Sequence, residues 1–382
     1  MWLLWIGLLS SVALADDKLL FAQAVFRHGD RTPIFSYETD PYNETFWGRP
    51  FGDLTERGMK QHFIQGSRLR ARYVDNAKLI RGTYNRDDIK IRSSQMPRCL
   101  QSSFSNAAGL YQGSATFPND VDGWPSGWTP IPVHAINEDE DRAIECGGDC
   151  PRKAVLMVER ALRKEYQDYI ANYFDLFETI AAHTARNYTG GSLEDVIDVA
   201  GFYLSVHVER GYYNLTLPAW VTDDVYNRLE EFVNNSIDYV FGSAGFGADD
   251  DINLINLRGG FLLQELIGNF QGAKEGGKEK LRIYQAHDVS IMGLLQTLEC
   301  KKDLVGIVRP DYASAVLSEL WKKDDGKFYV KFLYSDNAST DYKPFTKLIK
   351  GCPTDSDFCL LDTLISRSAK YTSVKPSDCN LL

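Results

Sequence analysis

The stretch LLFAQAVFRHGDRTP, residues 19–33, decides the fold of this chain. Residues 19–26 form a mainly apolar run with the length and composition of a buried strand. The run ends in RHGDRTP, where two arginines, a histidine and an aspartate surround Gly29. A solvated loop has no need of a buried strand that ends in such a cluster, whereas a site that binds and attacks an anion does. We therefore expect residues 19–33 to carry part of a catalytic site.

The composition places this stretch in a large globular protein. The 382 residues are 44% hydrophobic and 25% charged, which suits one large domain with an insertion, or two domains. The formal net charge of -10 argues against a nucleic-acid partner. Any anion site must therefore be a local cluster of cations on an acidic chain.

The N-terminus and the sequons indicate export. Residues 1–15, MWLLWIGLLSSVALA, have the short apolar core and small-residue ending of a signal peptide, with a buried N-terminal helix as the alternative. No later apolar run reaches the ~20 residues of a membrane span, so we expect no membrane anchor. We predict a secreted protein, with the lysosomal lumen as the alternative. Five glycosylation sequons agree, at Asn43, Asn187, Asn214, Asn234 and Asn337.

The cysteines fit an oxidising compartment, where most of them should pair. The count is odd, so at least one thiol is left over. The spacing of Cys146 and Cys150 resembles that of metal ligands, but no histidine or cysteine cluster accompanies them. We therefore expect neither a metal nor a cofactor. The seven cysteines are Cys99, Cys146, Cys150, Cys300, Cys352, Cys359 and Cys379.

The remaining pattern predicts an α/β fold with a mixed, mostly parallel sheet flanked by helices. Further strands are expected at 89–91, 131–136 and 281–286, and a hairpin at 314–335 turns at Asp-Asp-Gly. The middle of the chain is mostly helical, over 153–182, 193–209 and 223–241. We predict a catalytic domain built from 16–115 and 252–382, with a mainly α-helical insertion at 116–251. Leaving-group contacts are expected from the 34–51 loop and from this insertion.

Three expected strands end in cationic or titratable residues, and the binding crevice of an open α/β sheet lies at the carboxyl ends of its strands. If the three strands are neighbours, their polar residues converge. Arginine forks suit the oxygens of phosphate, an imidazole can attack phosphorus, and a carboxyl group can protonate the leaving alkoxide. The converging residues would be Arg27, His28, Arg31, Arg92, His287 and Asp288.

The heptapeptide RHGDRTP resembles the RHGxRxP signature of the histidine acid phosphatases, a branch of the phosphoglycerate-mutase-like superfamily. His287 and Asp288, directly after a strand, are similar to the second motif of that family. The resemblance implies a histidine phosphatase fold, with His28 as the phosphohistidine nucleophile and Asp288 as the proton donor. It further implies that the phosphoryl oxygens are bound by Arg27, Arg31, Arg92 and His287.

The resemblance also extends to disulfides and assembly. Cys150 with Cys379, and Cys352 with Cys359, resemble two disulfides of the family. The other three cysteines have no confident match. A homodimer is possible, because some family members are dimers.

The predicted function is that of a secreted acid phosphatase acting on small-molecule phosphate monoesters. Because Asp288 must hold a proton to act as an acid, we expect an acidic pH optimum. One alternative is a phytase-like hydrolase of polyphosphorylated substrates. The other is a secreted binding protein whose ancestral catalytic site is no longer used.

Overall fold

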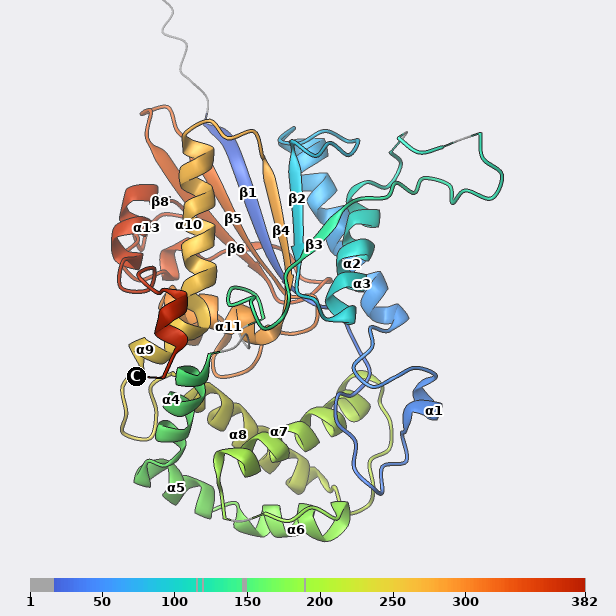
Figure 1. Cartoon of the computed structure of the whole chain (residues 1–382), viewed down its shortest axis with the longest axis vertical. Helices are drawn as coiled ribbons and strands as arrows, with labels where there is room; N and C mark the ends of the chain where they lie inside the picture. The colour runs from blue at the N-terminus through green and yellow to red at the C-terminus, as the bar shows by residue number, and fades with distance from the viewer. Residues whose placement is uncertain (1–16, 115, 119, 146–149, 189, 382) are drawn as a thin grey trace, which may run out of the picture.

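The computed structural model describes residues 17–114, 116–118, 120–145, 150–188 and 190–381. The predicted signal peptide and Cys146 lie outside the described residues. Figure 1 shows a twisted sheet covered by helices, with a second group of helices packed below one end of the strands.

The sheet has eight strands in the order β3-β2-β4-β1-β5-β6-β7, with β8 paired to β6. The strands β1, β4, β2 and β3 run parallel to one another, and β5 to β8 form antiparallel pairs. The mixed α/β sheet predicted from the sequence is therefore confirmed. The strands are β1 (Lys18–Arg27), β2 (Ile89–Ser93), β3 (Val133–Ala135), β4 (Leu281–Ala286), β5 (Ala315–Lys322), β6 (Phe328–Ser335), β7 (Lys343–Pro344) and β8 (Cys359–Leu360).

Strand β1 is apolar because both faces of the sheet are covered. Its alternate residues belong to two different hydrophobic clusters: Phe21 and Val25 pack on one side, Ala24 and Phe26 on the other. Helices α10 (Phe261–Lys274) and α11 (Asp288–Thr297) lie on the first side, and α2 (Glu56–Leu69) and α3 (Pro97–Leu110) lie on the second. A strand buried on both faces reads as a continuous apolar run rather than an alternating one.

Helices α2 and α3 pack closely enough to fix the position of α3 relative to the strands. Thr55 caps α2, its side chain accepting a hydrogen bond from the backbone N–H of Gly58. A Cβ added at Gly66 of α2 would lie 1.9 Å from the backbone oxygen of Asn106 in α3, so only glycine allows this approach. The last turns of α3 are thereby held against α2.

A second group of helices has a hydrophobic cluster of its own, centred on side chains such as Tyr166, Leu229 and Phe232. It lies below the carboxyl ends of the central strands in Figure 1. These helices are α4 (Pro151–Ala161), α5 (Lys164–Ala171), α6 (Phe174–Thr184), α7 (Leu193–His207) and α8 (Asp223–Val240). Strand β3 also falls within the predicted insertion at 116–251, yet it pairs with β2 at the edge of the sheet.

Shorter helices and two disulfides complete the chain. The disulfides Cys150–Cys379 and Cys352–Cys359 are both present, as the family resemblance implied. Among the described cysteines, Cys99 and Cys300 are buried and unpaired. The shorter helices are α1 (Glu44–Trp47), η1 (Arg70–Asn76), η2 (Val208–Tyr212), α9 (Ile252–Ile255), η3 (Asn256–Gly260), α12 (Lys301–Val305), η4 (Thr346–Leu348), α13 (Leu361–Ser368) and η5 (Pro376–Cys379).

Candidate active site

The three strands that carry the predicted site lie side by side, as required. Strand β4 pairs in parallel with β1 on one side and with β2 on the other. The pairing continues just past the strand ends, where the backbone N–H of His28 donates to Ala286 O at 3.0 Å. The rings of His28 and His287 are thereby brought to 5.6 Å between centroids. Both histidines line a cavity of about 400 Å³ that opens below the sheet.

His28 is held as a neutral imidazole with one nitrogen free to attack. Its Nδ1 lies 2.8 Å from the carbonyl oxygen of Gly29. A carbonyl can only accept, so Nδ1 carries the proton and Nε2 presents its lone pair. Burial, followed by the charges of Arg98, Arg27 and other neighbours, lowers the pKa of His28 well below 6.5. The imidazole therefore stays nucleophilic in acid.

Two buried arginines flank His28, one at the end of β1 and one in the loop that follows it. The Nη1 of Arg27 donates to Pro310 O at 2.6 Å, and its Nη2 lies 3.3 Å from the Asp288 carboxylate. Its guanidinium also stacks 4.1 Å from the ring centroid of Tyr312. Arg31 donates to Thr32 O at 2.8 Å. The Nε atoms of both arginines are buried with no hydrogen-bond partner among the described residues. Each guanidinium group can therefore still donate a hydrogen bond to a ligand.

Arg92 does not converge on the cavity, contrary to the sequence prediction. Its guanidinium forms an ion pair with Asp141 at 2.6 Å and a second one with Glu265 of α10. Arg92 lies inside β2, and successive strand side chains point to opposite faces. At this position the side chain is directed toward α10 rather than past the end of the strand.

Arg98 occupies the place that Arg92 was expected to fill. It belongs to the first turn of α3, lines the cavity, and is the foremost charge acting on His28. Its Nε is buried without a partner among the described residues. The sequence did contain a signal for it, because an arginine in the first turn of a helix that follows a strand end faces the same crevice. The prediction instead relied on the arginine within the strand.

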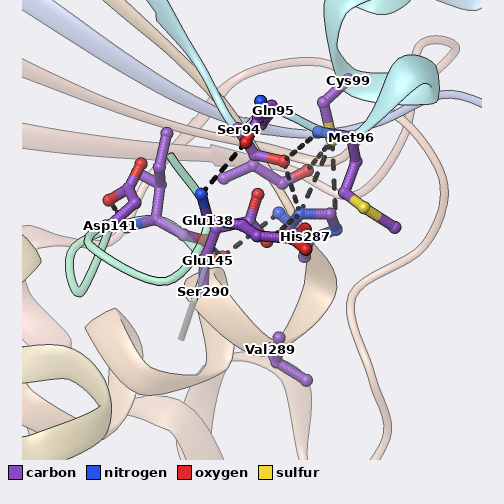
Figure 2. Close-up of polar contacts among 12 residues, drawn as sticks. Ser94, Gln95, Met96, Cys99, Glu138, Asp141, Glu145, His287, Val289 and Ser290 are labelled. Atoms are coloured by element: carbon purple, nitrogen blue, oxygen red, sulfur yellow. Dashed lines mark hydrogen bonds and ion pairs between the residues drawn. The ribbon is translucent and has the colours of Figure 1, made fainter. Parts of the chain in front are cut away.

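His287 lies in a polar cluster shown in Figure 2. Its Nε2 is 2.9 Å from Ser94 Oγ and 3.2 Å from Glu145 Oε2, and Cys99 Sγ is 3.7 Å away. Burial alone would lower the pKa of His287, but Cys99 and Glu145 outweigh it and raise the pKa to about 10. The ring is therefore a cation at acidic pH and can donate to a bound anion. Sequence reasoning missed Glu145, because no pattern links it to a strand end.

Asp288 follows His287 at the start of α11, with its carboxylate between two arginines. Oδ2 lies 3.3 Å from Arg27 and 3.4 Å from Arg309. Burial opposes ionisation, but Arg27, Arg309 and His287 overcome it and hold the pKa of Asp288 well below its usual range. Asp288 is thus ionised in the free protein.

Two features concern the described residues as a whole. No group of three or more His, Cys, Asp or Glu side chains among them is arranged to hold a metal ion. Within the same residues, no helix is both long and apolar enough to cross a membrane.

Comparison with known proteins identifies the family of the chain. The model of the histidine phosphatase superfamily (branch 2) matches residues 18–335. The chain belongs to this family. It is 31% identical over 339 residues to bovine prostatic acid phosphatase, covering 88% of the chain and 81% of the relative. It is 32% identical over 356 residues to the lysosomal acid phosphatase of Xenopus laevis, covering 92% of the chain and 77% of the relative.

Solved structures share the histidine phosphatase fold. The phytase of Hafnia alvei in complex with tartrate superposes with a TM-score of 0.66 at 15% identity, covering 96% of this chain and all of the other. The phytase of Citrobacter braakii superposes with a TM-score of 0.65, also at 15% identity, over 95% of this chain and 99% of that one. These likenesses concern the fold alone.

Proposed function

We propose that the protein is an acid phosphatase that hydrolyses small-molecule phosphate monoesters through a phosphohistidine on His28. One observation carries the proposal: the free Nε2 of a neutral, buried imidazole lies in a cavity that is also lined by arginines and by the carboxyl group of Asp288. The family relatives named acid phosphatases support it.

The phosphoryl group binds between the cationic side chains at one end of the cavity. Planar guanidinium forks donate to its oxygens and offset the charge that these oxygens carry in the transition state. His287 adds a further donor as an imidazolium ion. The binding residues are Arg27, Arg31, Arg98 and His287, with Arg98 in place of the expected Arg92.

The first chemical step transfers the phosphoryl group to the protein. Nε2 of His28 forms a bond to phosphorus while the bond from phosphorus to the ester oxygen breaks. Asp288 gives a proton to the departing oxygen, so the product is a neutral alcohol. Because the Asp288 carboxyl is ionised in the free protein, this proton arrives with a monoanionic substrate and moves to Asp288 on binding.

The second step restores the protein. A water molecule attacks the phosphorus of the phosphohistidine, the P–N bond breaks, and the Asp288 carboxylate accepts a proton from that water. His28 returns as a neutral imidazole. Asp288 passes its proton to the departing phosphate, which leaves as the monoanion, and the carboxylate of the free protein is restored. No oxidant, reductant or second substrate is needed.

Two variants test the proposal. His28→Ala abolishes phosphate release from an aryl phosphate at pH ~5, and labelled phosphate stays on the wild-type chain after alkaline denaturation but not on the variant. Asp288→Asn slows the hydrolysis of alkyl phosphates far more than that of 4-nitrophenyl phosphate. The alkoxide is the poorer leaving group and needs the proton, whereas 4-nitrophenolate does not. A wild-type protein that released no phosphate from any monoester would overturn the proposal in favour of a binding protein.

The phytase-like alternative receives less support. A substrate with many phosphates needs several cations beyond the reacting centre. Among the described residues that line the cavity, Arg309 is the single arginine or lysine outside the phosphoryl-binding set, and it is paired with Asp288.

We further propose that the protein is exported, to the outside of the cell or to the lysosomal lumen. The two disulfides support an oxidising compartment, and the relatives carry prostatic and lysosomal names. Asn43, Asn187 and Asn214 are exposed, as glycosylation requires. Asn234 and Asn337 are half-buried, and Ser236 of the Asn234 sequon is buried inside α8, so we propose that Asn234 carries no glycan.

A further inference from the structure

The cavity has two chemically different ends. The phosphoryl-binding side chains and Asp288 occupy one end, against the strands. The rest of the wall is almost entirely apolar and comes from helices α4, α7 and α8 and from the loop after RHGDRTP. Its main side chains are Phe35, Met157, Val196, Ile197, Leu204 and Phe241.

Part of the apolar wall is open to solvent, although Val196 belongs to the buried core of the helices. Ile197 is 45% exposed and Phe35 is 36% exposed, although both border a cavity of about 400 Å³. A Cβ at Gly201 of α7 would lie 2.9 Å from the ring of Phe35, so the glycine lets the aromatic ring lie flat against the helix. Large apolar side chains left exposed around a concave site are typical of a surface that an apolar ligand covers.

A second cavity adjoins the first, but it does not receive the leaving group. It measures about 200 Å³ and is lined by polar and aromatic side chains, among them Tyr203, His207 and Glu230. Arg27 and Arg31 border it, whereas neither His28 nor Asp288 does. The ester oxygen must lie beside the proton donor when the bond breaks. Since Asp288 lines the apolar cavity, the alcohol part of the substrate extends there.

Resting on the proposed function, we propose that the preferred substrates are monophosphate esters of apolar alcohols, with an alkyl or aryl group seated against α7 and α8. A sugar, a nucleoside or an inositol phosphate would leave its hydroxyls facing Phe35, Ile197 and Leu204 without hydrogen-bond partners. Such unpaired polar groups weaken binding, whereas each methylene placed on this wall strengthens it.

The test is a series of n-alkyl phosphates from ethyl to octyl, below the concentration at which they aggregate, compared with glycerol 2-phosphate and glucose 6-phosphate. The expected result is a rise in kcat/KM of about threefold to fourfold for each added methylene until the wall is covered. The polar esters should fall well below the alkyl ester of similar size. Ile197→Ser should flatten the slope against chain length.

Val158→Ser is the matched control, because Val158 is 41% exposed on the neighbouring helix α4 and does not line the cavity. It should leave the slope unchanged. Equal kcat/KM along the series, or a preference for the polar esters, would overturn this inference while the phosphatase proposal stood. Absence of phosphate release from every ester would overturn both.

Discussion

Replacing Arg98 and Arg92 in turn separates a phosphate-binding arginine from a structural one. Arg98→Ala removes a guanidinium from the cavity that contains His28. Loss of one preorganised donor to a developing oxyanion costs about 10²-fold to 10³-fold in rate. We therefore expect kcat/KM for an aryl phosphate to fall by about that factor, with little change in the melting temperature.

Arg92→Ala should lower the stability of the fold and leave kcat/KM almost unchanged. Arg92 is paired with Asp141, whose side chain is fully buried, so the variant leaves an uncompensated carboxylate in the interior. Breaking a buried pair in this way costs about 3–5 kcal/mol of stability. The melting temperature should fall by several degrees, while kcat/KM for each folded molecule stays near the wild-type value.

The stability loss in Arg92→Ala should also depend on pH. Burial raises the pKa of Asp141, and Arg92 opposes that rise. Without Arg92, Asp141 becomes protonated more easily in acid, so the loss of stability should be larger at pH 7 than at pH 5.

The assay combines steady-state kinetics with thermal unfolding, and Arg92→Lys and Arg98→Lys keep the charge without the planar fork. A large loss of kcat/KM in folded Arg92→Ala, together with near-normal activity in Arg98→Ala, would refute the assignment of Arg98 to phosphate.

Three further predictions concern protons. First, kcat/KM should fall as pH rises above about 6, because the monoanionic ester that supplies the proton of Asp288 disappears near the second pKa of a phosphate ester; a flat profile from pH 5 to 8 would contradict this origin of the proton. Second, Glu145→Gln should lower the pKa of His287 from about 10, so that the inhibition constant of inorganic phosphate rises more near neutral pH than at pH 5. If the ratio of the inhibition constants at neutral pH and at pH 5 were the same in Glu145→Gln as in the wild type, Glu145 would not be the group that raises the pKa of His287. Third, burial, followed by Asp40, raises the pKa of Glu209 to about 8, and both of its carboxyl oxygens lack hydrogen-bond partners among the described residues. The unfolded chain loses this proton near pH 4.5 and the folded chain only near pH 8, so ionisation favours unfolding as pH rises between these values. Glu209→Gln should therefore stabilise the fold by about 2–3 kcal/mol at pH 7 and hardly at all at pH 4, as thermal unfolding at both pH values would measure; equal shifts at the two pH values would disprove it.

Much of the fold follows from the sequence because a buried strand is recognisable as a local run of apolar residues. The run before Arg27 is apolar since both faces of β1 are covered, and the residues after β1 and β4 meet because parallel strands end at the same edge of the sheet. These two facts predict from the sequence alone that His28, His287 and Asp288 lie together.

The tertiary structure decided which side chains complete the cavity. Arg92 and Arg98 are only six residues apart, and their fates depend on the face of β2 and on the turn of α3 that each occupies. Glu145 reaches His287 from a separate loop, a contact that no local pattern records. The apolar wall of the cavity also depends on the tertiary structure. A helix packed inside a protein is apolar for many reasons, and only the placement of α7 and α8 opposite the strand ends turns part of their apolar surface toward the substrate.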